Sequence, residues 1–270
     1  MASALDGLAL YLRLIRARIR AQTQYPASLA IEIFAVLVFS ALDFAVILVI
    51  FVNVPRLGDW SMPEVALLYA ITTLAFALTD LVIGHLDLFP ELIRDGNFDL
   101  VLIRPRSTLL QIVTRDFQLR RLGKAVQGLF VLGYALAQLH VSWSPDRVLV
   151  LAVAPIAGAV IFGAIWVAGI SVAFWTVDAK EVANAFTYGG QAFAQYPISV
   201  YERWLRWLLA YLGATAFISY LPTLYVLGKP DALGLPAGLQ LASPLVAVVA
   251  SLVAGSIWSF AVRHYRSAGG

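Results

Sequence analysis

The stretch ASLAIEIFAVLVFSALDFAVILVIFV, from Ala27 to Val52, contains only two charged side chains, Glu32 and Asp43. A helix needs about 20 mainly apolar residues to cross the hydrocarbon core of a bilayer, so this stretch predicts a transmembrane helix. The whole chain of 270 residues is similar in character, because 61% of it is hydrophobic and 13% is charged. A soluble domain carries about 25% charged residues. The sequence therefore predicts an all-α integral membrane protein.

Five other stretches are long and apolar enough to cross a membrane. Pro26 and Pro63 stand at the starts of the first two spans, where a missing N–H costs nothing. We predict a single transmembrane permease domain, 1–270, whose six spans cover residues 27–52, 63–86, 122–141, 148–177, 207–227 and 241–262.

The distribution of Lys and Arg predicts the orientation of these spans. If both termini are cytoplasmic, sixteen of the 19 Lys and Arg residues lie inside, and only Arg56, Arg147 and Lys229 lie outside. Cytoplasmic loops of membrane proteins carry an excess of positive charge. We therefore expect a multi-pass protein with both ends in the cytoplasm.

A polar insert, LFPELIRDGNFDLVLIRPRS, runs from Leu88 to Ser107 between the second and third spans. Pro90 suits the first turn of a helix, and Glu91 favours its positive N-terminal end. Gly96 is a typical helix stop, and a second apolar turn ends before Pro105. Leu92 and Ile93 are free to point at a partner or at the bilayer. An ordinary positively charged loop explains the arginines but not the helix signals, so we predict a docking element for another protein.

Two other segments are predicted at the cytoplasmic surface. Residues Leu5 to Gln24 carry leucine and isoleucine at helical spacing with arginines on other faces, which predicts an amphipathic helix in the membrane interface. Residues Asp178 to Arg206 are rich in aromatic side chains, which suit an interfacial location.

The sequence lacks the motifs of several common kinds of enzyme and nucleotide-binding site. The sequence has no phosphate-binding loop, no G-x-S-x-G and no H-E-x-x-H. It has no cysteine, and its histidines, His85, His140 and His264, lie at different ends of different spans. We therefore expect no catalytic site, no metal site and no cofactor in this chain, and the net charge of +3 gives little reason to expect nucleic-acid binding.

Carboxylates inside predicted spans are candidates for a translocation path, because a charge at membrane depth usually faces a bundle interior or an aqueous cavity. Asp43 and Asp80 are the two candidates. The structural alternative is that Asp43 is hydrogen-bonded between helices, that Glu32 lies at headgroup level, and that Asp80, His85 and Asp87 are interfacial residues. In that alternative these last residues pair with arginines such as Arg115, Arg120 or Arg121.

Small residues along the fourth predicted span indicate close helix packing. Gly158, Gly163 and Gly169 recur there among several alanines, and small side chains let helix backbones approach each other. Packing inside the subunit is the default interpretation.

Three stretches carry a resemblance to a known family. The insert resembles a G-x-[LF]-D-x-x-L-x-[RK]-P loop, with Gly96, Phe98, Asp99, Leu102, Arg104 and Pro105 at the matching positions. Tyr196-Pro197, followed by an apolar stretch with Pro222 and Gly228, resembles a Y-P-[IL] segment. The ending RHYRSAGG resembles R-x-Y-x-S-A-G, at Arg263, Tyr265, Ser267, Ala268 and Gly269. The chain thus resembles permease subunits of bacterial ATP-binding-cassette exporters of the type-2 class, in the branch with six spans and no fused ATPase.

This resemblance implies a division of labour between subunits in the bacterial inner membrane. Two permease copies, or this chain and a similar one, would form the path, and a cytoplasmic ATPase dimer would bind ATP and Mg and drive transport. The insert would supply the coupling helix, and the amphipathic helix would act as a connecting helix at the same surface. The implied ATPase-docking residues are Glu91, Leu92, Ile93, Arg94, Asp95, Gly96, Phe98, Asp99, Leu102, Arg104 and Pro105.

Two other function classes remain as alternatives. A secondary transporter or channel would use the carboxylates of Asp43 and Asp80 for ion coupling, and a membrane enzyme acting on lipid would need a catalytic constellation that the sequence does not offer. The scarcity of intramembrane charge favours an amphipathic or lipidic substrate, a peptide or a natural product.

Overall fold

The computed structural model describes residues 13, 15–115, 117–176, 179–207, 214–231 and 233–265. These residues form helices and no strands, with one isolated bridge between Leu57 and Trp60. In chain order, with η marking 3₁₀ helices, they are α2 (Pro26–Asn53), α3 (Met62–Ile83), η1 (Gly84–Leu88), α4 (Phe89–Arg94), α5 (Asp99–Leu102), α6 (Thr108–Val113), η2 (Leu119–Arg121), α7 (Leu122–Gln138), α8 (Pro145–Ile170), η3 (Ser171–Phe174), α9 (Ala179–Ala194), η4 (Ile198–Val200), α10 (Arg203–Trp207), η6 (Thr215–Phe217), α11 (Tyr220–Leu227), η7 (Ala237–Leu241) and α12 (Ser243–Arg263).

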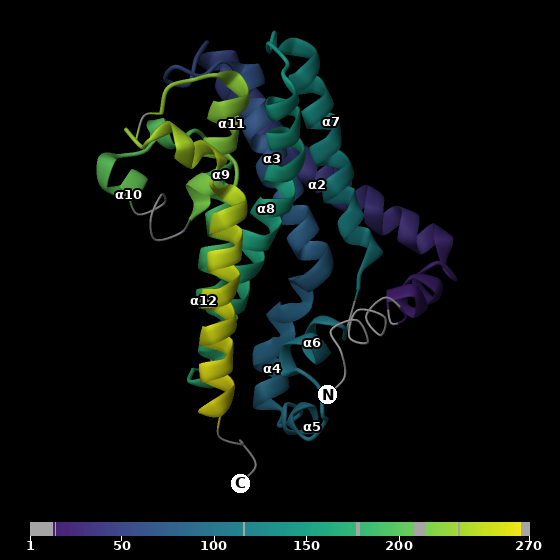
Figure 1. The fold of residues 1–270 in the computed structure, drawn as a ribbon. Coiled ribbons are helices and arrows are strands. Elements are labelled where there is room, and N and C mark those ends of the chain that lie inside the picture. The colour runs from purple at the N-terminus through teal and green to yellow at the C-terminus, as the bar shows by residue number, and fades with distance from the viewer. Residues whose placement is uncertain are drawn as a thin grey trace.

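Four continuous helical stretches in the described part of the chain are long and apolar enough to cross a membrane: Pro26–Asn53, Met62–Arg94, Pro145–Phe174 and Ser243–Arg263. α7, with 17 residues, is shorter and runs beside them. The bundle has two ends, which we call the α5 end and the α11 end after the helices that lie there (Figure 1). The finding agrees with the prediction of an all-α membrane protein.

α3 is the central helix of the bundle. Its residues from Val65 to Ala77 are all buried, which requires that its polar side chains find partners inside the protein. The hydroxyl of Thr79 donates to the backbone oxygen of Ala159 at 2.8 Å, and that of Thr72 donates to the backbone oxygen of Ala194 at 2.8 Å. These bonds join α3 to α8 and to the end of α9.

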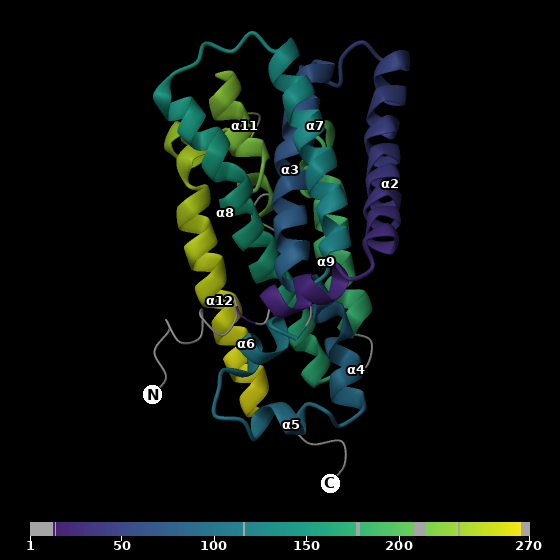
Figure 2. The ribbon, with the colours of Figure 1, turned by 90° about the vertical axis from the view of Figure 1, so that its right-hand side faces the viewer.

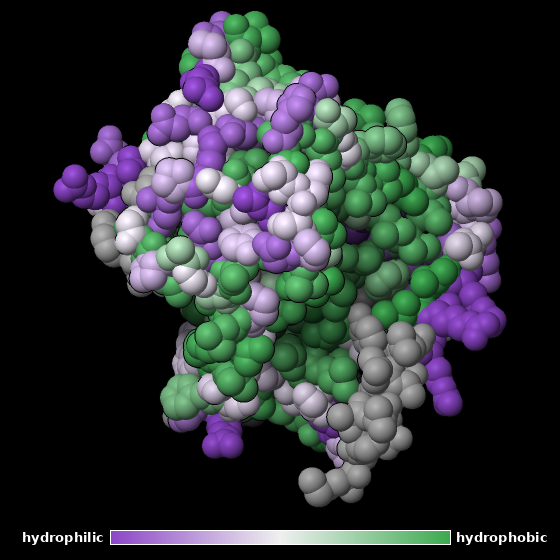
Figure 3. All heavy atoms as spheres, turned by 45° about the horizontal axis from the view of Figure 1, so that its top comes forward, coloured by the Kyte–Doolittle hydropathy of each residue, from purple (hydrophilic) through white to green (hydrophobic). Residues whose placement is uncertain are grey.

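α2 lies at the edge of the bundle and packs mainly against α7 (Figure 2). Gly123 makes this contact possible, since a Cβ at this position would lie 2.6 Å from the backbone oxygen of Ile33. The outer faces of α2 and α12 expose large apolar side chains such as Phe39, Val49 and Leu252. Seen obliquely from the α11 end, polar residues gather on that end while much of the visible side surface is apolar (Figure 3), which is the distribution that a surrounding bilayer requires.

Close packing along the fourth predicted span occurs inside the subunit, as expected. A Cβ on Gly158 would lie 2.9 Å from the Cβ of Ala75, and one on Gly169 would lie 3.2 Å from the Cα of Ala183. These two glycines therefore let α8 approach α3 and α9 closely.

The structure differs from the prediction between residues 179 and 227. The predicted fifth span, 207–227, is not one continuous helix in the described residues, which give α10, η6 and the eight-residue α11; residues 208–213 lie outside them. α11 lies where α3 and α8 begin, since the ring of Tyr220 is 5.9 Å from that of Trp60 and the hydroxyl of Tyr225 donates to Asp146 at 2.7 Å.

α9 instead runs through the bundle, antiparallel to α8. Its early residue Ala183 faces Gly169, and its last residue, Ala194, meets Thr72 in the middle of α3. The chain then continues toward the α11 end, where Ile198 and Tyr201 join the apolar cluster around Trp60. The prediction of an interfacial segment on the arginine-rich side for residues 178–206 is therefore wrong.

This rearrangement changes the charge count that gave the orientation. Arg206 donates to the backbone oxygens of Tyr201 and Ser199, at 2.6 and 2.7 Å, so it lies with Arg203 toward the α11 end. Moving these two arginines turns sixteen against three into fourteen against five. The bias keeps its direction and still places more positive charge at the α5 end.

Candidate functional site

The insert between α3 and α7 folds into short helices at the α5 end. α4 has Pro90 in its first turn and ends at Arg94. Gly96 follows with a φ of +70°, a conformation that side chains with a Cβ rarely adopt. The chain reverses there, because the N–H of Phe98 bonds to the oxygen of Leu92 at 3.1 Å. The start and stop signals read from the sequence are confirmed, and α5 follows directly.

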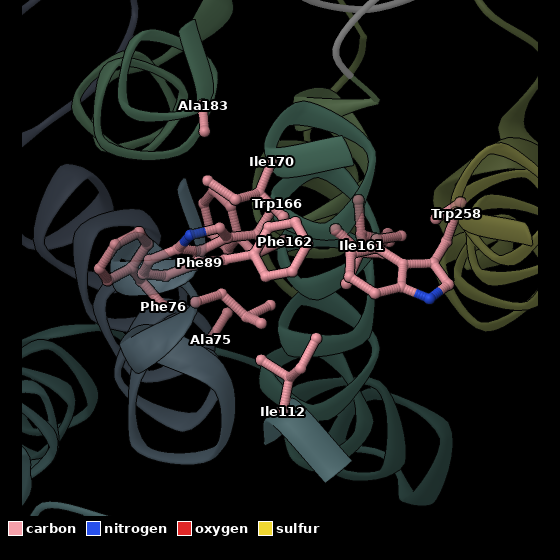
Figure 4. Close-up of a cluster of buried hydrophobic side chains, with 14 of the residues drawn as sticks. Ala75, Phe76, Phe89, Ile112, Ile161, Phe162, Trp166, Ile170, Ala183 and Trp258 are labelled. Carbon is pink, nitrogen blue, oxygen red and sulfur yellow. The ribbon is translucent and has the colours of Figure 1, made fainter. Parts of the chain in front are cut away.

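An aromatic cluster fixes this insert to the bundle. The ring of Phe89 lies 5.1 Å from that of Trp258 in α12, and the two are part of a larger buried apolar cluster (Figure 4). The ring of Phe98 lies 5.3 Å from that of Phe174 and 4.9 Å from that of Tyr265. Such edge-to-face contacts add to the free energy of burial. α4 and α5 are therefore held by the ends of α8 and α12.

This packing corrects part of the predicted docking set. Phe98 is fully buried and Leu92 is 7% exposed, while Ile93 packs against the same core. Leu92 therefore points into the protein and not outward, whereas Ile93 is half-buried at the edge of the core.

The exposed part of the insert is α5 and the bend after it. Ile103 is 78% exposed and Leu100 is 56% exposed. Around them lie other predicted docking residues that are exposed or half-exposed: Glu91, Arg94, Asp95, Gly96, Asp99, Leu102, Arg104 and Pro105. The sequence analysis did not name Leu100 and Ile103 as docking residues, although both lie in the second apolar turn that it predicts. We call residues 99–105 the α5 surface.

Hydrogen bonds tie the α5 surface to its neighbours. The side-chain amide of Gln111 in α6 donates to the backbone oxygens of Val101 and Arg106, both at 3.1 Å. The indole N–H of Trp258 donates to the hydroxyl of Thr108 at 3.1 Å. A nitrogen of the His85 ring lies 2.7 Å from the backbone oxygen of Ile112. A displacement of α5 would therefore be transmitted to α6, α12 and the end of α3.

The N-terminal segment contacts the same region. Residues 15–22 are helical, whereas residues 1–12 and 14 of the predicted amphipathic helix lie outside the described part. The guanidinium of Arg18 donates to the backbone oxygen of Arg115 at 2.8 Å. Gln22 bonds through its amide to the oxygen of Phe117 and accepts from the N–H of Leu119 at 2.8 Å. Between this helix and α4 lies a cavity of about 430 Å³, lined by polar side chains that include Arg18, Glu91, Asp95 and Arg115.

α9 is connected to α4 by polar contacts. Lys180 forms an ion pair with Glu91 at 3.8 Å, between half-exposed side chains. Asp87 accepts from the indole of Trp166 at 3.0 Å and from the hydroxyl of Tyr188 at 3.3 Å. These contacts connect α9 to α4, and η1 to α8 and α9, beside the insert.

The candidate path carboxylates lie in different surroundings. Asp80 forms an ion pair with Arg121 at 3.1 Å, and both side chains are largely buried, as the structural alternative expected. Asp43 is exposed on α2, and so is Glu32. The described residues hold no group of three His, Cys, Asp or Glu side chains that could bind a metal ion. Asp80, His85 and Asp87 therefore have separate partners and do not form one site.

The bundle of apolar helices, with a polar insert anchored at one end, defines a multi-pass membrane protein of the permease kind. The chain matches the family described as ABC-2 family transporter protein over residues 37–269. It therefore belongs to that family, and it is a membrane subunit of an ABC transporter. No curated protein and no solved structure matches it. Membrane subunits of this family are generally not catalytic themselves.

Proposed function

We propose that this chain is the membrane subunit of an ATP-driven exporter and that it couples to separate ATPase subunits through the α5 surface. The observation that carries the proposal is the combination of exposed apolar and charged side chains on residues 99–105 with buried anchors, such as Phe98, directly beneath them. A surface that must transmit movement needs both an outward face for a partner and a rigid connection to the helices that move.

The orientation follows from the corrected charge bias. The α5 end faces the cytoplasm of a bacterial cell, with both termini on that side of the inner membrane. Six crossings are then made by α2, α3, α7, α8, α9 and α12, and the described residues between 198 and 241 form the outer end of the path. A second copy of this chain or a similar permease supplies the other half.

In this mechanism ATP and Mg are bound by the ATPase dimer. Closure of that dimer moves the α5 surface, and the Phe89–Trp258 and Phe98–Phe174 contacts carry the movement into α12 and α8. ATP can shift the permease between two states only if it favours one of them through the ATPase. The path then opens to the outside.

Co-purification tests this proposal. The substitution Ile103→Asp places a charge on the α5 surface without changing the core. Asp99→Lys reverses a charge on the same surface, and Arg94→Glu reverses an exposed charge at the end of the neighbouring α4. We expect these changes to reduce the amount of ABC-type ATPase that co-purifies with the wild-type chain by about tenfold, since a desolvated charge at a contact costs a few kcal/mol. Arg120→Glu, exposed but outside the α5 surface, is the matched control. Undiminished ATPase with all three variants would contradict the proposal.

The alternative of a secondary transporter now depends mainly on Asp43. Asp80 already forms an ion pair with Arg121, whereas Asp43 is an exposed carboxylate in the middle of α2. Transport that persists without any ATPase, responds to a pH gradient and is lost in Asp43→Asn would favour this alternative.

A further inference from the structure

Two neighbouring cavities lie at the α11 end, beside the start of α8. The first has a volume of about 570 Å³ and is lined by charged and polar side chains that include Asp146, Arg147, Tyr225, Lys229 and Gln240. The second has a volume of about 270 Å³, is lined by residues of α8, α11, η7 and the start of α12, and shares Gln240 with the first. A polar cavity and a second cavity of different character therefore adjoin each other.

The second cavity is apolar. Its walls include Leu149 and Pro222, and the hydroxyl of Ser243, which also lines it, already donates to the backbone oxygen of Phe217 at 2.6 Å. An apolar cavity of about 150 Å³ is large enough to hold a benzene ring, so this cavity has room for part of an acyl chain. Leu149 is 64% exposed and Leu241 is 47% exposed. The cavity therefore borders the outer surface, where lipid chains surround the bundle.

Arg147 supplies the polar cavity with a cation that has donors to spare. Its Nη1 donates to the backbone oxygen and to the hydroxyl of Ser142, at 2.9 and 2.5 Å, but a guanidinium has five donor hydrogens. No carboxylate in the described part of the chain forms an ion pair with it. Lys229, in contrast, donates to Glu64 at 2.8 Å and to the backbone oxygen of Asp59 at 2.7 Å. Arg147 is therefore the cation that can receive an anion.

Asp146 supplies the same cavity with a negative charge. It lies in the first turn of α8 and is exposed. Its carboxylate accepts from the hydroxyl of Tyr225 at 2.7 Å and also interacts with Ser144, but a carboxylate offers about four acceptor positions. The cavity thus presents a cation and an anion together. This arrangement complements a zwitterionic group and disfavours a purely anionic one.

The positions of the two cavities along α8 fit the length of a phospholipid. Arg147 stands at the start of the helix, whereas Val153 and Ala154, which line the apolar cavity, are about two turns further on. This separation is roughly 10 Å along the helix axis. A phospholipid has the same order, because its charged headgroup lies at the membrane surface and its acyl chains run from there into the hydrocarbon core.

We propose that the two cavities bind a membrane phospholipid with an ethanolamine headgroup. Arg147 donates to the phosphate, Asp146 accepts from the ammonium, and one acyl chain fills the apolar cavity. In the proposed orientation this lipid comes from the outer leaflet, and it connects α8 to α11 and α12. The site goes beyond the proposed coupling function and does not depend on an ATPase.

Native mass spectrometry of the purified permease, without ATPase, tests the site. The protein is kept in dodecyl maltoside and mixed with dioleoyl phosphatidylethanolamine or with dioleoyl phosphatidylglycerol, which has the same chains and phosphate but no ammonium. We expect the wild type to retain the ethanolamine lipid at least about fivefold more strongly. Arg147→Gln should weaken its retention by about tenfold, since it removes charge-assisted hydrogen bonds. Ala154→Leu should also weaken it, because the larger side chain fills the apolar cavity.

Three further variants separate this site from general effects of charge. Arg56→Gln and Asp59→Asn change exposed side chains at the same end of the bundle but outside both cavities, and they should alter retention by less than about twofold. Asp146→Asn should remove the preference for the ethanolamine lipid over phosphatidylglycerol. A preference that survives in Asp146→Asn would contradict the assignment of the ammonium to this carboxylate.

Equal retention of the ethanolamine lipid by the wild type and Arg147→Gln would overturn the proposal, as would no retention by the wild type or equal retention of both lipids. If a variant does not fold, the wild type alone decides. Glycerophosphoethanolamine, which is the headgroup without chains, should not displace the lipid at equal concentration, and displacement would show that the apolar cavity is not used.

A variant that changes the oligomeric state but not lipid retention would assign the cavities to a second copy of the chain and overturn the proposal. Because no ATPase is present, loss of coupling through the α5 surface cannot produce any of these results.

Discussion

At the scale of single residues, the charges buried in the bundle differ in how they are compensated. Asp80 and Arg121 form a largely buried pair, whereas Lys124 has an amide and an aromatic ring. The sequence identified Asp80 as a polar residue at the end of a span and named Arg121 among three possible partners. It could not select Arg121 or predict the surroundings of Lys124, because both depend on how α3 and α7 face each other.

The Asp80–Arg121 pair predicts a specific pattern of stability. Arg121→Gln leaves a buried carboxylate without its counter-charge and should lower the free energy of unfolding by about 3 kcal/mol. Adding Asp80→Asn should restore most of that loss, because the uncompensated charge is gone. Thermal unfolding of the two variants in the same detergent measures the difference. A double variant less stable than Arg121→Gln would contradict this account.

Gly123 gives a second prediction at this scale. Gly123→Ala should destabilise the protein by about 1–3 kcal/mol, since the new methyl group would overlap the backbone of α2. Gly133→Ala in the same helix is the control, because a Cβ there meets nothing within 4 Å. The control should be neutral or slightly stabilising, as alanine favours helix. Similar unfolding temperatures for both variants would argue against a close contact between α2 and α7.

At the scale of elements, the insert combines local signals with long-range anchoring. Pro90 and Gly96 mark the limits of α4 in the sequence as in the structure. The directions in which Phe98 and Phe89 point depend on Phe174, Trp258 and Tyr265, which come from segments more than seventy residues away. Local patterns therefore predicted that the short helices exist, but not which of their faces is free.

Phe98 is the residue through which this anchoring can be tested. Phe98→Ala should cost about 3–5 kcal/mol, as other buried phenylalanines do, and should expose the insert to proteases before the rest of the bundle unfolds. Leu100→Ala, on the exposed side of α5, should change stability by less than about 0.5 kcal/mol. Limited proteolysis and thermal unfolding measure both effects. Equal resistance to proteolysis would show that Phe98 is not an anchor.

At the scale of the whole molecule, the path of the described residues between 179 and 241 decides which surfaces face outward. α9 passes through the bundle, so α10 lies toward the α11 end and away from α5 (Figure 1). With the α5 end in the cytoplasm, Trp204, which is 68% exposed, should face the outside of the cell.

Cysteine labelling tests this topology directly, because the natural chain has no cysteine. In intact cells whose outer membrane has been removed, a membrane-impermeant maleimide should label Trp204→Cys, but should label Arg104→Cys only after the inner membrane is permeabilised. Both positions are exposed, so access alone distinguishes them. The reverse pattern would invert the proposed orientation, and labelling of both positions only after permeabilisation would contradict the placement of α10 on the outer side.

The sequence by itself determined the class of this protein, its most apolar helices and the limits of the short helices in the insert, because hydropathy, proline and glycine act locally. Only the tertiary structure decided the course of α9. Its Thr187 and Gln191 lower the hydropathy of the segment, yet Thr187 bonds to its own helix and Gln191 accepts from Lys124. A polar side chain with a partner inside the bundle costs little to bury, and that partner is known only when the helices are assembled.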